Sequence, residues 1–451
     1  MARRVSLVIA PPAPTELYAP GTFPVPDGRG RWRVTLHRRS FGNPASVALP
    51  TWQSTVLVEL DARGRRLEQA WNTPAQFTFT LDGHEPAAAS VLELQTEVYV
   101  WRWDDTQGAD VCMFRGPITQ SEDQLTEQSH VVTFTAHDYL ALLTRRVTIA
   151  ALPWTITQLS QDVIARTMIA NASAITPLSG ASFVPGSTLP LWAAWANPDG
   201  TTRADAAVLR DRSYTGGSVY GDLLDQLAKV DGGFDYDVIP EPNVPAAAGS
   251  PSATQPVRPG VDAVRIFYPR QGVTRSDMML LYGGNVASLT RTISSADYAN
   301  YVRSVGNKAS SDPATAQLVA EAYNADTNNT AQNSLGLWAT GDNASDVSIL
   351  ATLQQRATGL LNVDGVLTPA YTLGLRPDTY VLGMPNMGDV VPLRIRSGRL
   401  DVNTTVRVVG ISYDIGDDGE EDIGLTVGRP VQTLAKVVTA IGRDVNALAR
   451  R

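Results

Sequence analysis

The feature that most constrains the fold is a series of short runs of alternating apolar and polar residues between Trp32 and Ala136. The runs are rich in Val, Thr, Phe, Tyr and Trp, and they read WRVTLHR, STVLVELD, GRRLEQAW, AQFTFTLD, EVYVWRW, DVCMF, ITQSED and HVVTFTA. Turn-forming residues separate them, for example at 62–64 and 81–86. Strands that are spaced so regularly and bury one face are typical of a sandwich or a barrel, so residues 31–150 are predicted to form a first β-barrel domain.

The period changes at His137, where HDYLALLTRR follows the last run. A short helix is predicted there, because its apolar residues fall on overlapping faces of about two helical turns. We interpret His137 and Asp138 at the helix start as capping residues rather than as a catalytic pair. We expect this helix to lie where the first β domain meets the following insertion or a neighbouring subunit.

Residues 151–284 are predicted to form an α/β domain with long loops. A helix is expected to follow Pro153, with Thr155 as its N-cap, because the next apolar residues recur at helical spacing. These residues are Ile156, Leu159, Val163, Ile164 and Met168. Residues 171–217 lack a clear period and are interpreted as an irregular surface connection.

The second half of this domain has a helix, a glycine stop and a strand. Apolar residues line one helix face over 219–230, Gly232-Gly233 ends the helix, and residues 234–238 alternate as a strand. A loop of Pro, Ala and Ser follows at 240–260 and is expected to join two antiparallel neighbours.

A second series of strands occupies 285–307 and 363–430 and is predicted to form a second β-barrel domain. Residues 308–362 between them are predicted to be a helical insertion, with one helix starting at Pro313 and another from about Ser345. The predicted fold class is therefore α+β, mainly β, with two β-barrel domains, an α/β domain between them and a helical insertion in the second.

The two ends of the chain differ from the rest. Residues 1–30 are rich in proline and glycine and are predicted to be an extended arm. Residues 431–451 are predicted to be a C-terminal helix whose apolar positions form an a/d heptad seam. The seam is a candidate subunit interface, or else it docks on its own chain, and consists of Leu434, Val438, Ile441, Val445 and Leu448.

Composition excludes several classes of site. Cys112 is the only cysteine, so a disulfide within the chain and paired-cysteine zinc sites are excluded, and we expect this thiol to be buried in its strand. The net charge of -8 argues against a general nucleic-acid binder. Residues 1–66 nevertheless hold ten arginines and four acidic residues, whereas residues 67–136 hold two arginines and eleven acidic residues. Such blocks either pair between subunits or are differently charged solvated faces.

Catalytic and metal-binding motifs are not found. The four histidines form no HExxH motif, and GxSxG, P-loop and intact GxGxxG sequences are missing. The acidic run DIGDDGEED breaks the calcium-loop pattern at Gly416, and Asp418-Gly419 is instead typical of a hairpin turn. We therefore expect no enzyme activity, no cofactor and no metal. We also expect no signal peptide and no stable membrane insertion, because no apolar run approaches the length of a membrane span.

The order of these elements resembles the baseplate hub, or minor tail, proteins of long-tailed, siphovirus-type bacteriophages. The stretches that carry the resemblance are FRGPITQSEDQ, TAHDYLALLTRRV, SVYGDLLDQLAKVDGGFDYDV and NYVRSVGN, followed by the late set of four strands. The resemblance covers about residues 30–430, and its motifs concern organisation rather than catalysis. It implies two tail-tube-like barrels, two α/β insertions and assembly as a homotrimer around the tail axis.

The resemblance also implies partners and a location. Such hubs lie in the virion at the tail tip, are assembled in the host cytoplasm, and join the distal tail protein to downstream tip or receptor-binding proteins. Their lumen passes the tape-measure protein and DNA in transit. The alternative interpretation is a receptor- or carbohydrate-binding minor tail protein, suggested by nine tryptophans and the long loops. A cell-wall hydrolase is the third and least favoured hypothesis.

Overall fold

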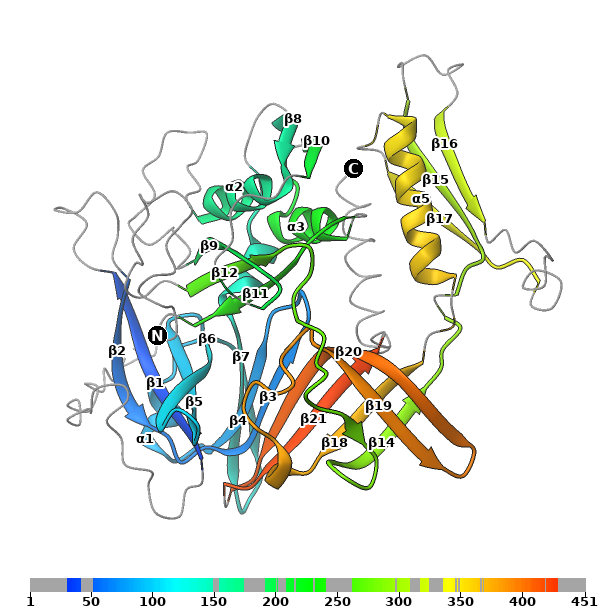
Figure 1. The fold of residues 1–451 in the computed structure, drawn as a ribbon. Coiled ribbons are helices and arrows are strands. Elements are labelled where there is room, and N and C mark those ends of the chain that lie inside the picture. The colour runs from blue at the N-terminus through cyan, green and yellow to red at the C-terminus, as the bar shows by residue number, and fades with distance from the viewer. Residues whose placement is uncertain are drawn as a thin grey trace. The chain divides into compact units, whose positions relative to one another are not determined.

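The computed structural model describes most of the chain between residues 31 and 428 (Figure 1). The described residues are 31–41, 52–148, 154–173, 191–199, 201, 208–214, 216–229, 232–240, 262–296, 298–308, 317–323, 336–344, 347, 349–365, 367, 369–417 and 419–428. The predicted arm at 1–30 and the predicted helix at 431–451, with the whole heptad seam, lie outside them. The chain divides into two compact units. Unit 1 comprises Met1–Val273, Val381–Met384 and Ile411–Ile423, and unit 2 comprises Thr274–Tyr380, Pro385–Gly410 and Gly424–Arg451.

Seven antiparallel strands of unit 1 form what we call the first β module. Its strands are β1 (Trp32–Phe41), β2 (Trp52–Glu59), β3 (Arg63–Ala70), β4 (Gln76–Asp82), β5 (Thr96–Asp104), β6 (Ala109–Leu125) and β7 (His130–His137), with the short helix α1 (Pro86–Ser90) after β4. They are hydrogen-bonded in the order β3-β4-β7-β6-β5-β1-β2. The predicted strands are confirmed, except that DVCMF and ITQSED belong to one long strand, β6, whose register shifts between Ile118 and Gln120.

Alternation explains why these residues form a sheet with one buried face. In β4 the side chains of Phe77, Phe79 and Leu81 are buried, while the residues between them are partly exposed. Phe79 stacks on Phe134 of the paired strand β7, with ring centroids 5.3 Å apart. The core of the module is therefore built from every second residue, as the pattern predicts.

Two late strands add residues to the first β module. These are β20 (Leu400–Ile415) and β21 (Glu421–Gly428), whose hairpin end, Ile411–Ile423, belongs to unit 1. In the sheet, β20 is hydrogen-bonded to β3, the first strand in the order of the module. Gly419 closes the turn at φ +87°, and its N–H donates to the carbonyl of Gly416. The predicted hairpin is thus confirmed, although Asp418 lies outside the described residues.

The rest of unit 1 is an α/β part. It contains the 3-10 helix η1 (Tyr139–Arg145), β8 (Trp154–Ser160), α2 (Gln161–Ser173), β9 (Leu191–Ala196), β10 (Leu209–Tyr214), α3 (Tyr220–Ala228), β11 (Asp235–Ile239) and β12 (Asp262–Phe267). The sheet has the order β11-β12-β9, and β11 and β12 are antiparallel as predicted. Helices α2, α3 and η1 share one buried core with this sheet (Figure 1).

Two predictions for this part were wrong. The helix expected after Pro153 begins only at Gln161, because Trp154–Ser160 is a strand paired with β10. Its β-branched residues favour a strand, and Trp154 packs against Tyr214 across the pair, with ring centroids 5.5 Å apart. The segment 171–217 is not an irregular surface connection, since it contains β9 and β10. The strand β9 has no visible period because it pairs in parallel with β12 and is mostly buried.

Unit 2 contains the second series of strands. These are β13 (Leu280–Leu281), β14 (Val286–Thr292), β18 (Ala370–Leu375), β19 (Val390–Ser397) and the remaining parts of β20 and β21, with the 3-10 helix η3 (Pro377–Thr379) after β18. The order is β14-β18-β21-β20, with β19 also paired to β20 and β13 to β19. Val391, Leu393 and Ile395 alternate as buried residues of β19.

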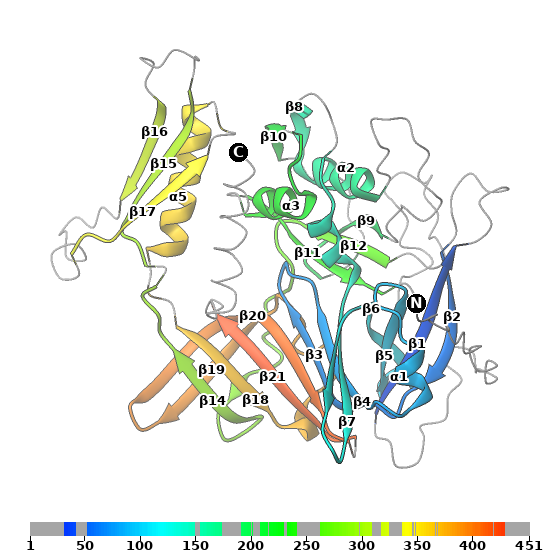
Figure 2. The ribbon, with the colours of Figure 1, turned by 180° about the vertical axis from the view of Figure 1, so that it is seen from behind.

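A separate small sheet of unit 2 corrects the prediction for residues 300–362. It has the order β16-β15-β17, with β15 (Tyr301–Lys308), β16 (Gln317–Tyr323) and β17 (Ala339–Ala344), and α5 (Leu350–Asp364) packs against β15 and β16 (Figure 2). The helix expected from Pro313 is therefore wrong, because Gln317–Tyr323 pairs with β15 along an alternating pattern. The strand predicted at 300–307 pairs within this small sheet and not in the same sheet as β14. The second predicted helix is confirmed as α5.

The predicted fold class, α+β and mainly β, is confirmed by these elements. The exact division into domains and the closure of the two barrels stay predictions. No helix in the described part of the chain is long and apolar enough to span a membrane.

Candidate functional site

The carboxylate of Glu421, at the start of β21, receives three hydrogen bonds inside unit 1. Arg102 donates from Nε to Oε2 at 2.9 Å and from Nη2 to Oε1 at 2.6 Å, and Trp32 donates from Nε1 to Oε2 at 2.7 Å. The Arg102 and Glu421 side chains are 2% and 6% exposed. Tyr413 of β20 packs on Trp32, with ring centroids 5.2 Å apart. This bidentate pair fixes the hairpin end on the first β module.

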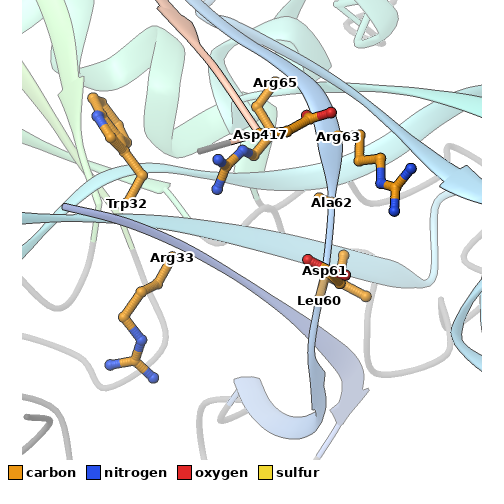
Figure 3. A pocket seen from close by; sticks show the side chains of 8 residues that line it. All are labelled: Trp32, Arg33, Leu60, Asp61, Ala62, Arg63, Arg65 and Asp417. Atoms are coloured by element: carbon orange, nitrogen blue, oxygen red, sulfur yellow. The ribbon is translucent and has the colours of Figure 1, made fainter. Parts of the chain in front are cut away.

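A hollow of about 350 Å³ lies beside this pair (Figure 3). It is lined by Trp32, Arg33, Leu60, Asp61, Ala62, Arg63, Arg65 and Asp417. Two of its arginines bind groups of the chain itself, since Arg33 donates to Asp110 at 3.1 Å and Arg65 to the Gly416 carbonyl at 2.5 Å. Arg63 is exposed at the rim. Among the described residues that line the hollow there is no histidine, cysteine, serine or threonine.

A second buried cluster surrounds Arg115 of β6 and joins the first β module to the α/β part of unit 1. Its Nη1 donates to Asp262 of β12 at 2.8 Å, and its Nη2 lies 3.4 Å from Glu97 of β5. Tyr139 of η1 donates its hydroxyl to Glu97. The guanidinium also lies over the rings of Tyr99 and Tyr139, at 5.2 and 5.3 Å.

The charges of the Arg115 cluster are fully withdrawn from water. The side chains of Arg115, Glu97 and Asp262 are 1%, 0% and 0% exposed. Burial lowers the pKa of Arg115, but the charges of Asp262 and Glu97 outweigh it and hold that pKa well above its usual value. The cluster is therefore a permanent ionic joint between strands that are far apart in the chain.

Asp138 holds the start of η1, as predicted. Its Oδ1 accepts from the N–H of Leu140 at 3.0 Å, and its Oδ2 accepts from the N–H of Ala75 at 2.8 Å, in the connection between β3 and β4. Burial, helped by the charge of Asp262, raises the pKa of Asp138 to about 7, against the lowering effect of the backbone donors. Tyr139, Leu140 and Leu143 of η1 enter the α/β core, so the helix lies at the predicted joint with the insertion.

The histidines do not gather into a catalytic group. His37 is buried, bonds the hydroxyl of Thr35 at 2.9 Å and stacks on Tyr99, and its pKa is lowered to about 3, mainly by burial. His137 Nδ1 lies 2.8 Å from the hydroxyl of Thr119. Within the described residues, no group of three or more His, Cys, Asp or Glu is arranged to hold a metal ion. Cys112 is buried, as expected.

The pair of Arg102 with Glu421 and the Arg115 cluster were not predicted from the sequence, although the sequence contains a partial signal for them. Arg102, Arg115 and Glu97 each interrupt an otherwise apolar strand, which is typical of buried pairs. The opposed charge blocks at 1–66 and 67–136 also meet within one chain. Arg31 lies 2.6 Å from Asp105, in addition to the pair of Arg33 and Asp110. Part of the predicted complementarity is therefore internal.

No family model and no curated protein matches the sequence. Among solved structures, the chain is similar to the tail protein from Neisseria meningitidis MC58, at 11% identity and a TM-score of 0.48, over 88% of this chain and 97% of that chain. It is also similar to the 43 kDa tail protein of prophage MuSo2 from Shewanella oneidensis, at 12% identity and a TM-score of 0.49, over 88% and 98%.

A third structure is prophage tail protein gp18 from Listeria monocytogenes EGD-e, matched at 12% identity and a TM-score of 0.48, over 92% of this chain and 99% of that chain. All three of these structures are described as tail proteins.

Proposed function

We propose that this protein is a structural component of a bacteriophage tail tip or baseplate, where it forms a homotrimeric hub of the siphovirus type. In this role it joins the distal tail protein to tip or receptor-binding proteins, and its lumen passes the tape-measure protein and DNA during ejection. It acts in the virion, is assembled in the host cytoplasm, and is not an enzyme. The order of elements over residues 30–430 supports the proposal, since the resemblance rests on that order.

The observation that carries the proposal is that buried ion pairs hold distant segments of unit 1 together. The cluster of Arg115 with Glu97 and Asp262, and the pair of Arg102 with Glu421, each tie a late segment of unit 1 to its first β module. A rigid joint of this kind suits a part that transmits load and holds shape. The net charge of -8 is compatible with a channel that does not retain phosphates, because each neutralised phosphate would add salt-sensitive affinity.

Assembly is tested by measuring the mass of the tag-free protein, full length and without residues 431–451. We expect a trimer for the full chain and a weaker one for the truncation, because the heptad seam of Leu434, Val438, Ile441, Val445 and Leu448 is its proposed interface. Ile441→Asp should weaken the trimer as the truncation does, while Arg443→Gln, off the seam, should leave it intact. A stable monomer at high concentration, together with tail particles that lack this chain at their tip, would refute the proposal.

A second candidate is a receptor- or carbohydrate-binding tail protein, and one exposed tryptophan favours it. Trp338 is 47% exposed and its ring packs edge-on against Tyr298, with centroids 6.4 Å apart. In contrast, Trp32, Trp101 and Trp195 are buried core residues. Glycan-array binding that disappears in Trp338→Ala would support this function, and an array without signal for the wild-type protein would reject it.

A further inference from the structure

Two of the four histidines of the chain lie together at one end of the first β module. His84 is in the turn that follows β4, and His130 is the first residue of β7. Their ring centroids are 5.6 Å apart and the rings are nearly perpendicular, at 84°. The two strands run side by side in the sheet, since Asp82 at the end of β4 pairs with Val131.

Each imidazole uses one nitrogen to bind a carboxylate. His84 Nδ1 lies 3.0 Å from Oδ1 of Asp82, and His130 Nε2 lies 2.8 Å from Oδ1 of Asp123. An ionised carboxylate only accepts hydrogen bonds, so these two nitrogens carry the protons in the neutral rings. The lone pairs are then on Nε2 of His84 and Nδ1 of His130, for which the described residues provide no hydrogen-bond partner.

The backbone holds the two histidines in place. The N–H of His84 donates to Oδ1 of Asp82 at 2.9 Å, and the N–H of Gly83 donates to the carbonyl of His130 at 2.7 Å. A Cβ at residue 83 would lie 2.3 Å from Nδ1 of His130, so the ring can take this position only beside glycine. The pair is therefore part of a fixed turn rather than of two independent surface side chains.

This arrangement has the features of a metal-binding imidazole pair. Zinc binds imidazole nitrogen at about 2.0–2.1 Å, so two rings on one tetrahedral ion have centroids about 5–6 Å apart, as these rings do. Metal-bound histidines usually donate their other N–H to a carboxylate, which is the role that Asp82 and Asp123 already have. We propose that His84 and His130 form a binding site for one divalent transition-metal ion such as zinc, with Asp82 and Asp123 as positioning residues.

The site supplies two protein ligands, and its exposure explains how the others are provided. The side chains of His84 and His130 are 76% and 26% exposed, so water or a donor atom from a bound partner can reach the remaining positions. Occupied, the site would cross-link the turn after β4 to the β6–β7 hairpin. The inference is independent of the proposed tail function.

The other two imidazoles and the thiol of the chain are unsuited to this role. His37 is 7% exposed, His137 bonds Thr119, and Cys112 is buried. Any imidazole-dependent binding of a metal ion should therefore come from His84 and His130.

The test is calorimetric titration of the tag-free full-length protein with zinc chloride at neutral pH. We expect one ion per chain, and at least about tenfold weaker binding in His84→Ala and in His130→Ala. Asp82→Asn and Asp123→Asn should weaken binding about 10–100-fold while both imidazoles remain. Zinc should also raise the Tm of the wild-type protein, since an ion that binds only the folded state stabilises it, and this rise should vanish in the His84→Ala/His130→Ala double variant.

The matched control is His137→Gln, which removes a histidine outside the site and should leave the affinity unchanged. Circular dichroism establishes that each variant is folded, and His84→Ala changes only an exposed side chain. The proposal is overturned if the wild-type protein binds no zinc, or if the double variant binds zinc as tightly as the wild type.

Discussion

Arg102 and Glu421 are separated by 319 positions in the chain, yet they form a buried bidentate ion pair in unit 1. Removing one partner of such a pair leaves the other charge buried without compensation. The pair therefore makes the first β module dependent on a hairpin that is completed only near the end of the described chain.

We expect Arg102→Met to lower the free energy of unfolding by about 3–5 kcal/mol, and Glu421→Met to be destabilising for the same reason. In the double variant Arg102→Met/Glu421→Met the free energy of unfolding should fall by much less than the sum of the two single-variant losses, because no charge is left buried without a partner. Urea unfolding followed by circular dichroism measures all of these. The exposed pair of Arg66 and Asp414 is the control, and Arg66→Gln should cost no more than about 1 kcal/mol. Additive losses in the double variant would contradict the coupling.

The Arg115 cluster should control how firmly the α/β part of unit 1 is held. In Asp262→Asn the guanidinium loses its closest charged partner, and we expect faster amide hydrogen exchange in β12, β9 and η1, with little change in β4 and β7. The control is Asp237→Asn on β11, whose partner Arg265 on β12 is 24% exposed, so its effect should stay within β11 and β12 and leave η1 unchanged. Uniform acceleration across the whole unit would show instead that the cluster stabilises the fold globally.

The strands with one buried face could be predicted from the sequence, because burial alternates with period two along them. Phe77, Phe79 and Leu81 are an example. The short runs at 154–160 and 317–323 could not, because each is compatible with both helical and strand spacing. Both runs are strands because each is paired with a neighbouring strand, Ile156 with Arg212 of β10 and Ala320 with Ser304 of β15.

The candidate site was less predictable than the fold. The capping role of Asp138 is local and was correctly inferred from its place before Tyr139. The joint of Arg115 with Asp262 spans 147 positions, and no spacing rule links residues so far apart. The pair of His84 and His130 could not be predicted from spacing either, because the two residues are brought together by the pairing of β4 with β7.

Two glycines of the small sheet and helix in unit 2 should respond in opposite directions to alanine. At Gly306 of β15 a Cβ would lie 2.7 Å from the carbonyl oxygen of Val347, so Gly306→Ala should destabilise the unit. At Gly359, inside α5, a Cβ would meet nothing within 4 Å, and Gly359→Ala should stabilise by up to about 1 kcal/mol. Thermal unfolding of both variants measures this, and a loss of stability in Gly359→Ala would contradict the packing of α5.

The buried carboxyl of Asp138 should make stability depend on pH. Its pKa is about 7 in the folded state, against 3.8 as the ordinary value, so between these values the folded protein binds more protons than the unfolded chain. Its contribution is fully present below about pH 4 and is lost as the pH rises towards 7. In Asp138→Asn this loss should disappear, which changes the slope of the unfolding free energy by at most about 1.4 kcal/mol per pH unit.

The Asp138→Asn variant also has a cost that does not depend on pH. Leu140 and Ala75 donate to different oxygens of Asp138, and in asparagine one of these oxygens becomes an NH2 group that cannot accept. One of the two buried donors therefore loses its acceptor, and we expect a loss of about 1–3 kcal/mol at every pH. The control is Asp199→Asn. The pKa of Asp199 is lowered by hydrogen bonds from Thr201, so this exposed carboxylate does not titrate between pH 5 and 7 and its variant should keep the wild-type slope. Urea unfolding at several pH values separates the two effects, and parallel profiles for wild type and Asp138→Asn would contradict the raised pKa.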